Sequence, residues 1–169
     1  MDEERKLILD ATCGGRSIWF DKHDPHTVYM DVRRDYFSDI WKNGNCHGEY
    51  LINPDVQADF TAIPFPDETF RLVVFDPPHL VRASYEAWLV KKYGKLEENW
   101  PQMLREGFRE CMRVLKPEGV LIFKWSEHDI AAEKVWEAIG HRPLFGHHSG
   151  KKSMTFWGCF MKFGKEETS

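Results

Sequence analysis

The stretch Arg71-Leu72-Val73-Val74-Phe75-Asp76-Pro77-Pro78-His79 decides how the rest of this sequence is interpreted. Its first five residues are a short run rich in β-formers, which predicts a buried strand. Two prolines end that strand, because proline donates no hydrogen bond to a sheet and disfavours a helical residue before it. We therefore expect a rigid elbow that holds Asp76 and His79 just beyond a strand's C-terminal end, where open α/β sheets bind ligands. Alone, the same residues also fit a Pro-Pro loop with a surface aspartate.

Strand-like and helix-like segments alternate along the chain. Two successive strands without a helix between them should form an antiparallel hairpin at one edge. The alternation predicts an α/β fold, a Rossmann-like, doubly wound, mostly parallel seven-stranded sheet with helices on both faces and that edge hairpin. The expected strands are 6–10, 27–31, 56–60, 71–75, 120–125, 143–147 and 154–163; the expected helices are 16–20, 36–41, 80–93, 100–115 and 129–139, the last capped by Asp129, with a turn at 116–119.

Length and composition predict one domain spanning residues 1–169, with its core at about 6–163. The chain has 169 residues, 42% of them hydrophobic and 30% charged, which is ordinary for a globular protein. No apolar run approaches the roughly 20 residues that span a bilayer, and the charged N-terminus is unlike a signal peptide. The four cysteines are widely spaced, which favours reduced thiols. We expect a cytoplasmic protein with no membrane partner and no metal.

Acidic residues end four of the predicted strands: Asp10, Asp31, Asp59 and Asp76. In a parallel sheet the four side chains would gather along one rim. Like charges crowded there are costly unless a ligand, a cation or a hydrogen-bond donor meets them. The rim is therefore the expected binding site.

The residues around these acids favour a nucleoside-like ligand. Asp10 is followed by Ala11, Thr12, Cys13, Gly14 and Gly15, and glycine lets the backbone approach a ligand closely. Asp31 stands where an acid typically accepts from two ribose hydroxyls. Asp59 could accept from an adenine amino group, with Phe60 or Ile63 against the ring. No G-x-G-x-x-G is present, so an adenosine without phosphates fits better than a dinucleotide.

At this point the chain resembles the class I S-adenosylmethionine-dependent methyltransferases, and within them the amino-methyltransferases with an Asp-Pro-Pro-Tyr-type motif. The resemblance covers about residues 6–163. It rests on Leu7-Ile8-Leu9-Asp10-Ala11-Thr12-Cys13-Gly14-Gly15, on Asp31, on Asp59-Phe60-Thr61-Ala62-Ile63-Pro64-Phe65-Pro66-Asp67, on Asp76-Pro77-Pro78-His79 and on Arg113-Val114-Leu115-Lys116-Pro117-Glu118-Gly119-Val120-Leu121.

The resemblance implies S-adenosyl-L-methionine as cofactor and N-methylation of an exocyclic amino group of a nucleic-acid base, adenine N6 or guanine N2, in DNA or RNA. It implies that Asp76, Pro77, Pro78 and His79 are catalytic. The implied cofactor-binding residues are Asp10, Ala11, Thr12, Cys13, Gly14, Gly15, Asp31, Asp59, Phe60 and Asp76.

Two residues depart from the family pattern. Arg16 stands where the glycine loop usually has a glycine, and we expect it to reshape the pocket near the methionine part of the cofactor. His79 stands where the motif usually has an aromatic residue. A histidine stacks on a base more weakly and adds a group that titrates near neutral pH.

Any nucleic-acid partner must be met by a local basic face or with help from another subunit, because the net charge is −4. The chain has no room for a separate target-recognition domain, so either its loops recognise the target, or the target is RNA or a single strand, or a partner supplies the grip. A base in a duplex would first have to be flipped out of the stack. A homodimer or a partner subunit stays open. The segment 80–100, with Tyr85, Trp88, Tyr93 and Trp100, could form a substrate lid. Candidate phosphate contacts are Arg82, Lys91, Lys92, Lys95, Lys151 and Lys152.

Two other function classes stay open. The first is a small-molecule methyltransferase with His79 as general base. The second is a cofactor-binding subunit with weakened catalysis, for which Arg16 and His79 are the reasons.

Overall fold

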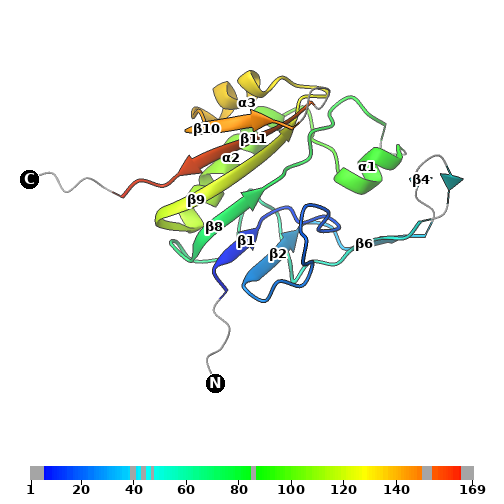
Figure 1. Ribbon diagram of the computed structural model, residues 1–169. Coiled ribbons are helices and arrows are strands. Elements are labelled where there is room, and N and C mark those ends of the chain that lie inside the picture. Colours follow the sequence, from blue (N-terminus) through cyan, green and yellow to red (C-terminus); the bar gives the residue numbers. More distant parts are fainter. Residues whose placement is uncertain are drawn as a thin grey trace, which may run out of the picture.

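A computed structural model describes residues 6–38, 41–42, 45–46, 48–84, 87–149 and 154–164. Its centre is a seven-stranded sheet of order β10-β11-β9-β8-β1-β2-β7 (Figure 1). The strands are β1 (Ile8–Asp10), β2 (Thr27–Asp31), β7 (Val56–Gln57), β8 (Phe70–Phe75), β9 (Leu115–Ser126), β10 (Phe145–His148) and β11 (Thr155–Met161). The helices are α1 (Trp88–Tyr93), α2 (Trp100–Val114) and α3 (Ala132–Ile139). Two small antiparallel pairs join β3 (Asp35–Phe37) to β6 (Tyr50–Ile52) and β4 (Trp41–Lys42) to β5 (Asn45–Cys46).

The pairing confirms the predicted α/β sheet. β1 lies between β2 and β8 and is parallel to both, and β9 is parallel to β8. β11 runs antiparallel to β9, and β10 antiparallel to β11, which is the expected edge hairpin. The strand order reverses between β1 and β8. This reversal is the switch point at which open α/β sheets bind ligands.

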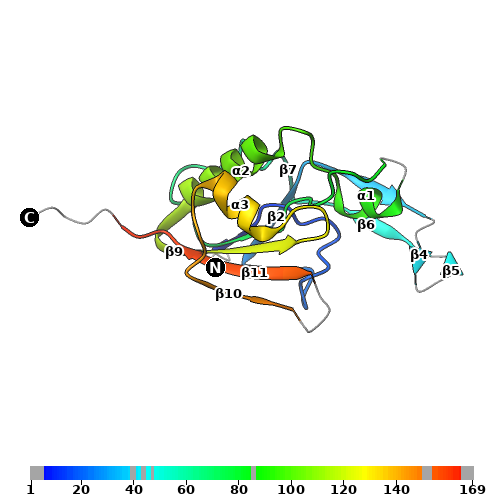
Figure 2. The ribbon, with the colours of Figure 1, turned by 90° about the horizontal axis from the view of Figure 1, so that it is seen from above.

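One face of the sheet forms the core against α2 and α3. Leu9, Val73, Leu121 and Phe160 lie side by side across four strands and are between 0% and 4% exposed. Phe160 packs edge-on against a phenylalanine of α2, with ring centroids 5.1 Å apart. Both helices lie on this side of the sheet (Figure 2).

The other face is covered only in part. Between β1 and β2 the segment 11–26 forms turns, and it covers β2: Trp19 packs edge-on against Tyr29 at 5.3 Å, and the Arg16 guanidinium lies 3.8 Å from the centre of the Tyr29 ring. Among the described residues no helix lies on this face, whereas helices were expected on both. The segment 11–26 contains two glycines and a proline, which favour turns over a helix.

Several expected elements are wrong or shorter. Residues 35–37 form β3, not a helix over 36–41, because they pair with β6. The third strand ends at Gln57 and not at residue 60. The expected turn 116–119 lies within β9, where the register shifts and Glu118 has φ 64°.

Two expected helices begin later than predicted. The helix of 80–93 is only α1, and α3 begins at Ala132 without a side-chain cap. Asp129 does not cap α3, because its carboxylate accepts hydrogen bonds from the backbone N–H groups of Val81 (2.8 Å) and Arg82 (3.0 Å). It therefore holds the chain that follows the Pro-Pro elbow. In the described part of the chain, no helix has the length and apolarity to cross a membrane.

Gly107 on α2 marks the tightest contact between helix and sheet. A Cβ at this position would lie 2.5 Å from Phe60 and 2.9 Å from Phe75. We expect Gly107→Ala to lower the free energy of unfolding by about 1–3 kcal/mol, because overpacking forces the buried rings to shift. Denaturant unfolding measures this. Gly164→Ala is the matched control, since nothing lies within 4 Å of a Cβ there; equal effects of the two changes would contradict the prediction.

Candidate cofactor and substrate site

Three of the four predicted acids meet at the switch point. Asp10 and Asp31 end β1 and β2 and are 1% and 5% exposed, and Asp76 follows β8. The loop after β1 ties them together. The Asp76 N–H donates to the Thr12 hydroxyl (2.9 Å), and the Gly14 N–H donates to the Asp31 carboxylate (2.9 Å). The predicted glycine loop thus lies between the two other acids.

Two small cavities open at this rim. They have room for about 30 and 40 Å³, enough for a water molecule but not for a nucleoside. A cofactor-sized ligand would therefore need lining residues, such as those of α1 and β6, to move. One cavity is lined by Thr12, Cys13, Gly14, Ser17, Arg33, Tyr50, Asp76, Pro77, His79, Lys92 and Tyr93, the other by Ala11, Thr12, Asp31, Val32, Arg33, Phe60, Asp76, Pro78 and Tyr93.

A larger cavity of about 560 Å³ lies elsewhere, along α2 beside Phe108 and His141. None of the strand-end acids lines it. The chemistry points to the smaller rim cavities, because the strand-end carboxylates of Asp31 and Asp76 line them.

Asp10 is the most strongly perturbed of the acids. Burial, together with the charges of Asp76 and Asp31, raises its pKa from 3.8 to about 7. Hydrogen bonds from the Trp19 indole (2.6 Å) and the Thr12 N–H (3.2 Å) oppose this rise. Near neutral pH the carboxyl is therefore part protonated, and a nearby cation would favour its ionised form.

The Asp31 carboxylate already has several hydrogen-bond partners within the protein. Besides Gly14, it accepts from the backbone N–H of Arg33 (2.9 Å) and from the Arg33 Nε (3.3 Å). The same guanidinium donates to the carbonyl of Lys91 in α1 (3.2 Å). Arg33 thus connects the acid expected to bind ribose with the lid helix.

Asp76 forms an ion pair that sequence reasoning missed. Its carboxylate lies 2.6 Å from the Nζ of Lys124, and both side chains are about one fifth exposed. Burial raises the pKa of Asp76, while the charge and hydrogen bond of Lys124 lower it. The signal in the sequence was a lysine inside an otherwise apolar strand, Val120-Leu121-Ile122-Phe123-Lys124-Trp125.

His79 lies between two aromatic rings. Its ring centre is 5.7 Å from that of Tyr93 and 6.4 Å from that of Trp125. Burial, together with the charges of Lys124 and His128, lowers its pKa to about 4. The expectation of a group titrating near neutral pH is therefore wrong, and His79 is a neutral ring at pH 7.

The fourth predicted acid stays apart from the other three. Asp59 is exposed, and its carboxylate accepts from the Thr61 N–H and hydroxyl, each at 2.8 Å. Its neighbour Phe60 is buried, lines one of the rim cavities and packs edge-on against Phe75. A role of Asp59 toward adenine stays a prediction.

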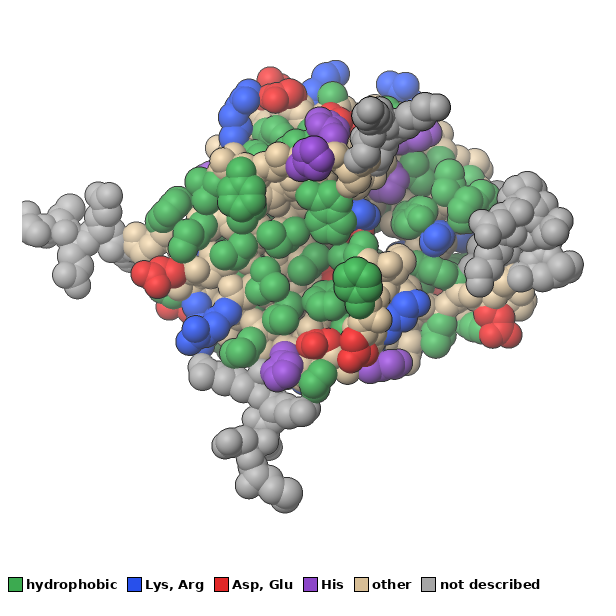
Figure 3. All heavy atoms as spheres, viewed as in Figure 1, with side chains coloured by type: hydrophobic (Ala, Val, Ile, Leu, Met, Phe, Trp, Pro, Cys, Tyr) green, Lys and Arg blue, Asp and Glu red, His purple; other side chains and the backbone are tan. Residues whose placement is uncertain are grey.

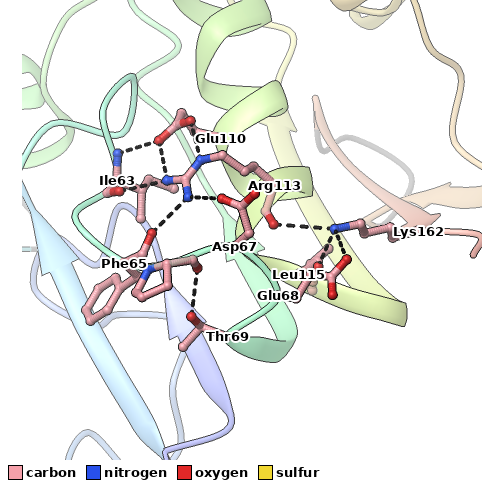
Figure 4. A network of polar contacts seen from close by, with 10 residues as sticks. Ile63, Phe65, Asp67, Glu68, Thr69, Glu110, Arg113, Leu115 and Lys162 are labelled. Carbon is pink, nitrogen blue, oxygen red and sulfur yellow. Dashed lines mark hydrogen bonds and ion pairs between the residues drawn. The ribbon is translucent and has the colours of Figure 1, made fainter.

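Arg113 of α2 fixes the loop that follows Phe60 (Figure 4). Its guanidinium donates to the carbonyls of Ile63 and Phe65, each at 2.9 Å, and to Glu110 and Asp67. Glu110 in turn accepts from the Ile63 N–H at 2.8 Å. No periodic pattern in the sequence indicates this network, because most of its bonds join residues 46 to 50 positions apart.

Arg16 does not line either rim cavity, contrary to the expectation that it reshapes the pocket. It has φ 55°, the left-handed conformation that a glycine would adopt easily. Its guanidinium donates to the carbonyls of Lys22 (2.6 Å) and Asn53 (2.9 Å) and to Asp55 (3.1 Å). The side chain therefore clamps the loops over β2.

Three aromatic rings surround the Lys92 ammonium group of α1. Lys92 Nζ lies 4.9 Å from the ring centre of Tyr93, 5.7 Å from that of Tyr50 and 5.8 Å from that of Trp88. Tyr50 also accepts the Gly15 N–H through its hydroxyl at 2.9 Å. Of the other residues expected in the lid or at phosphates, Trp100 begins α2, and Tyr85, Lys151 and Lys152 lie outside the described residues.

The sequence matches no family model and no curated protein. Solved structures do match it. The PH0226 protein of Pyrococcus horikoshii OT3 superposes with a TM-score of 0.58 at 15% identity, over 94% of this chain and 82% of that one. An rRNA methylase of Streptococcus thermophilus gives 0.55 at 13% identity, over 96% and 90%. A putative rRNA methylase of Clostridium thermocellum gives 0.51 at 12%, over 95% and 90%. The likeness shows a shared Rossmann-like fold.

Lys124 should keep Asp76 ionised. We expect Lys124→Met to raise the pKa of Asp76, as followed by carboxylate NMR. A raised folded-state pKa of an acid means that stability is lost as pH rises. The free energy of unfolding of the variant should therefore fall relative to the wild type as the pH rises above the ordinary pKa of a carboxyl group.

The control is Asp76→Asn combined with Lys124→Met, in which this pH-dependent difference should disappear. If the single variant and the wild type differ by a constant amount across the range, Lys124 does not govern the ionisation of Asp76.

Proposed function

We propose that this protein is an S-adenosylmethionine-dependent methyltransferase that methylates an exocyclic amino group of a nucleic-acid base. The observation that carries the proposal is the position of Asp76-Pro77-Pro78-His79. The elbow lies at the C-terminal end of β8, in a cavity wall shared with the loop after β1. The Thr12 hydroxyl binds the Asp76 backbone directly, so the two motifs of the family resemblance form one site.

The residues present fit the cofactor by their chemistry. S-adenosylmethionine carries two positive charges, on its sulfonium and its amino group, together with ribose hydroxyls and an adenine. Asp10, which ionises only near pH 7 without a cation, suits the amino group, and Asp31 suits the hydroxyls. Phe60 and Val32 supply apolar walls for the adenine. Bound there, the cofactor supplies an electrophilic methyl group.

The chain's own residues would position the nucleophile. An amino group conjugated with a ring is a weak nucleophile because its lone pair is delocalised. Hydrogen bonds from its two N–H groups to the Asp76 carboxylate and the Pro77 carbonyl would favour a pyramidal nitrogen and direct the lone pair toward the methyl group. Lys124 holds one carboxylate oxygen, which leaves the other to accept. The neutral His79 ring would stack on the base.

Aromatic rings beside a cation support a nucleic-acid substrate. Tyr50, Trp88 and Tyr93 offer flat surfaces to a base, and Lys92 among them offers a positive charge to a phosphate.

Lys92→Met should weaken nucleic-acid binding and its salt dependence, whereas Lys134→Met, at an exposed position of α3, should not. The same lid would also enclose a small aromatic amine, so small amines belong in the substrate panel.

A catalytically weakened cofactor-binding subunit is the alternative with an observation in its favour. Asp76 is held by Lys124 at 2.6 Å, and the rim cavities are narrow. Calorimetry with S-adenosylhomocysteine and S-adenosylmethionine tests the common element, since no heat with either would contradict both functions. Labelled methyl transfer to DNA, tRNA, rRNA and small amines then separates enzyme from subunit and chooses the substrate.

Replacing Asp76 separates catalysis from cofactor binding. We expect Asp76→Ala to reduce methyl transfer by at least about a hundredfold, because the amino group loses its principal acceptor. Cofactor affinity by calorimetry should change little. Asp76→Asn is the matched control for shape, and it should also be impaired because it lacks the charge. A lost cofactor affinity would show that Asp76 binds the cofactor and does not position the substrate.

Cofactor binding should depend on pH through Asp10. In the free protein the Asp10 carboxyl is protonated below about pH 7, and it must lose this proton when the cationic ligand binds. The affinity for S-adenosylhomocysteine should therefore rise by up to about tenfold per pH unit from pH 6 to 7 and level off above. Calorimetry in buffers of different ionisation heat measures the released proton. In Asp10→Asn the slope should vanish; a wild-type affinity that does not vary with pH would exclude Asp10 as the partner of the amino group.

A further inference from the structure

The sheet face opposite α2 and α3 is an apolar surface that the described residues cover only in part. We call this surface the open face. It consists of three rows of side chains that lie side by side in the register of the strands. They are Ile8, Leu72, Val120 and Met161; Val74, Ile122, Cys159 and Phe145; and Lys124, Trp157 and His147. Figure 3 shows hydrophobic side chains gathered over this face.

Much of this face is more exposed than the core face. Residues of the core rows, such as Leu9, Val73 and Leu121, are fully buried. On the open face Val74 and Cys159 are 7% and 9% exposed, whereas Ile8, Leu72 and Ile122 remain partly exposed and Phe145 at the edge is 70% exposed. Parallel sheets ordinarily have both faces covered, because their side chains are apolar on both sides.

We propose that a second copy of this chain covers the open face, in a two-fold symmetric dimer of sheet packed on sheet. The proposal does not depend on the enzymatic function. It follows from the size of the face, its lack of net charge and its shape.

The size suits an interaction surface. The eleven side chains of the three rows, about 4.8 Å apart between strands and about 6.7 Å apart along them, cover about 350 Å² in projection. Phe163, two residues after Met161, is 69% exposed. A contiguous apolar patch of this size is as large as the largest patch on a typical monomer, and such patches often mark an interaction site.

Charge argues against a nucleic acid or an acidic partner on this face. The middle row continues at Asp10 of β1, which is 1% exposed and accepts a hydrogen bond from the Trp19 indole. Among the side chains named above for the three rows, Lys124 is the one charged side chain, and its Nζ is paired with Asp76 and lies 5.8 Å from the Trp157 ring centre. Without charges to repel its own image, the face is compatible with itself under two-fold symmetry.

Shape favours a copy over a different protein. Two sheets pack about 10 Å apart with their strands inclined by about 30°, an angle that comes from equal right-handed twists. A second copy has the same twist by symmetry. The interface would also cover Trp157 and Lys124, so it would exclude water from one side of the Asp76 ion pair.

Sedimentation velocity and light scattering test the dimer on the wild-type chain. We expect a species of about 40 kDa, twice the chain mass of 19.9 kDa, at concentrations well above about 1 µM. Phe145→Asp should shift it to a monomer, because it places a charge in the middle row. Leu144→Asp is the matched control: Leu144 is 56% exposed, but it precedes Phe145 and points away from the open face. It should leave the dimer intact.

A second variant and a second measurement guard against misfolding. Met161→Lys places a charge in another row, and circular dichroism reports whether each variant is folded. Hydrogen exchange of the wild type should show slower exchange in β9 and β11 as concentration rises. A wild type that stays monomeric, or a dimer that Leu144→Asp disrupts as much as Phe145→Asp, would overturn the proposal.

Discussion

The site depends on the hydrogen-bond donors that contact three carboxylates at one end of the sheet. Each has a donor from a different segment: Asp10 has the Trp19 indole, Asp31 has the Gly14 N–H, and Asp76 has Lys124. Unpaired, each charge would carry a large desolvation cost. The turns after β1 and the middle of β9 are therefore held in place by the same interactions that keep the acids ionisable.

The three acids are unequal, and the difference has chemical meaning. Asp76 and Asp31 each contact a full positive charge, that of Lys124 and that of Arg33, while Asp10 is met by neutral donors and its pKa rises to about 7. Lys124 thus favours Asp76 as a hydrogen-bond acceptor before any ligand binds, whereas Asp10 needs a bound cation to favour its ionised form. Two carboxylates a few residues from parallel strand ends can serve different partners because their surroundings differ.

The sequence predicted what depends on strand periodicity and strand ends. The parallel sheet, the antiparallel edge and the meeting of Asp10, Asp31 and Asp76 all follow from apolar runs that end on acids. The prediction failed for Asp59. The strand ends earlier, at Gln57, and the Asp59 carboxylate accepts a hydrogen bond from Thr61, two residues on. Lys124 was missed because nothing local shows that a lysine in an apolar strand faces a carboxylate forty-eight residues away.

Arg16 connects the glycine loop with the uneven cover of the sheet. Because it adopts φ 55°, the backbone turns as a glycine loop would, yet the residue keeps a long side chain. That side chain stacks on Tyr29 and binds carbonyls at both margins of β2. One arginine thereby covers the part of the sheet over β2 that a crossover helix would otherwise cover. It cannot reach the rows over β8, β9 and β11, and that is where the open face begins.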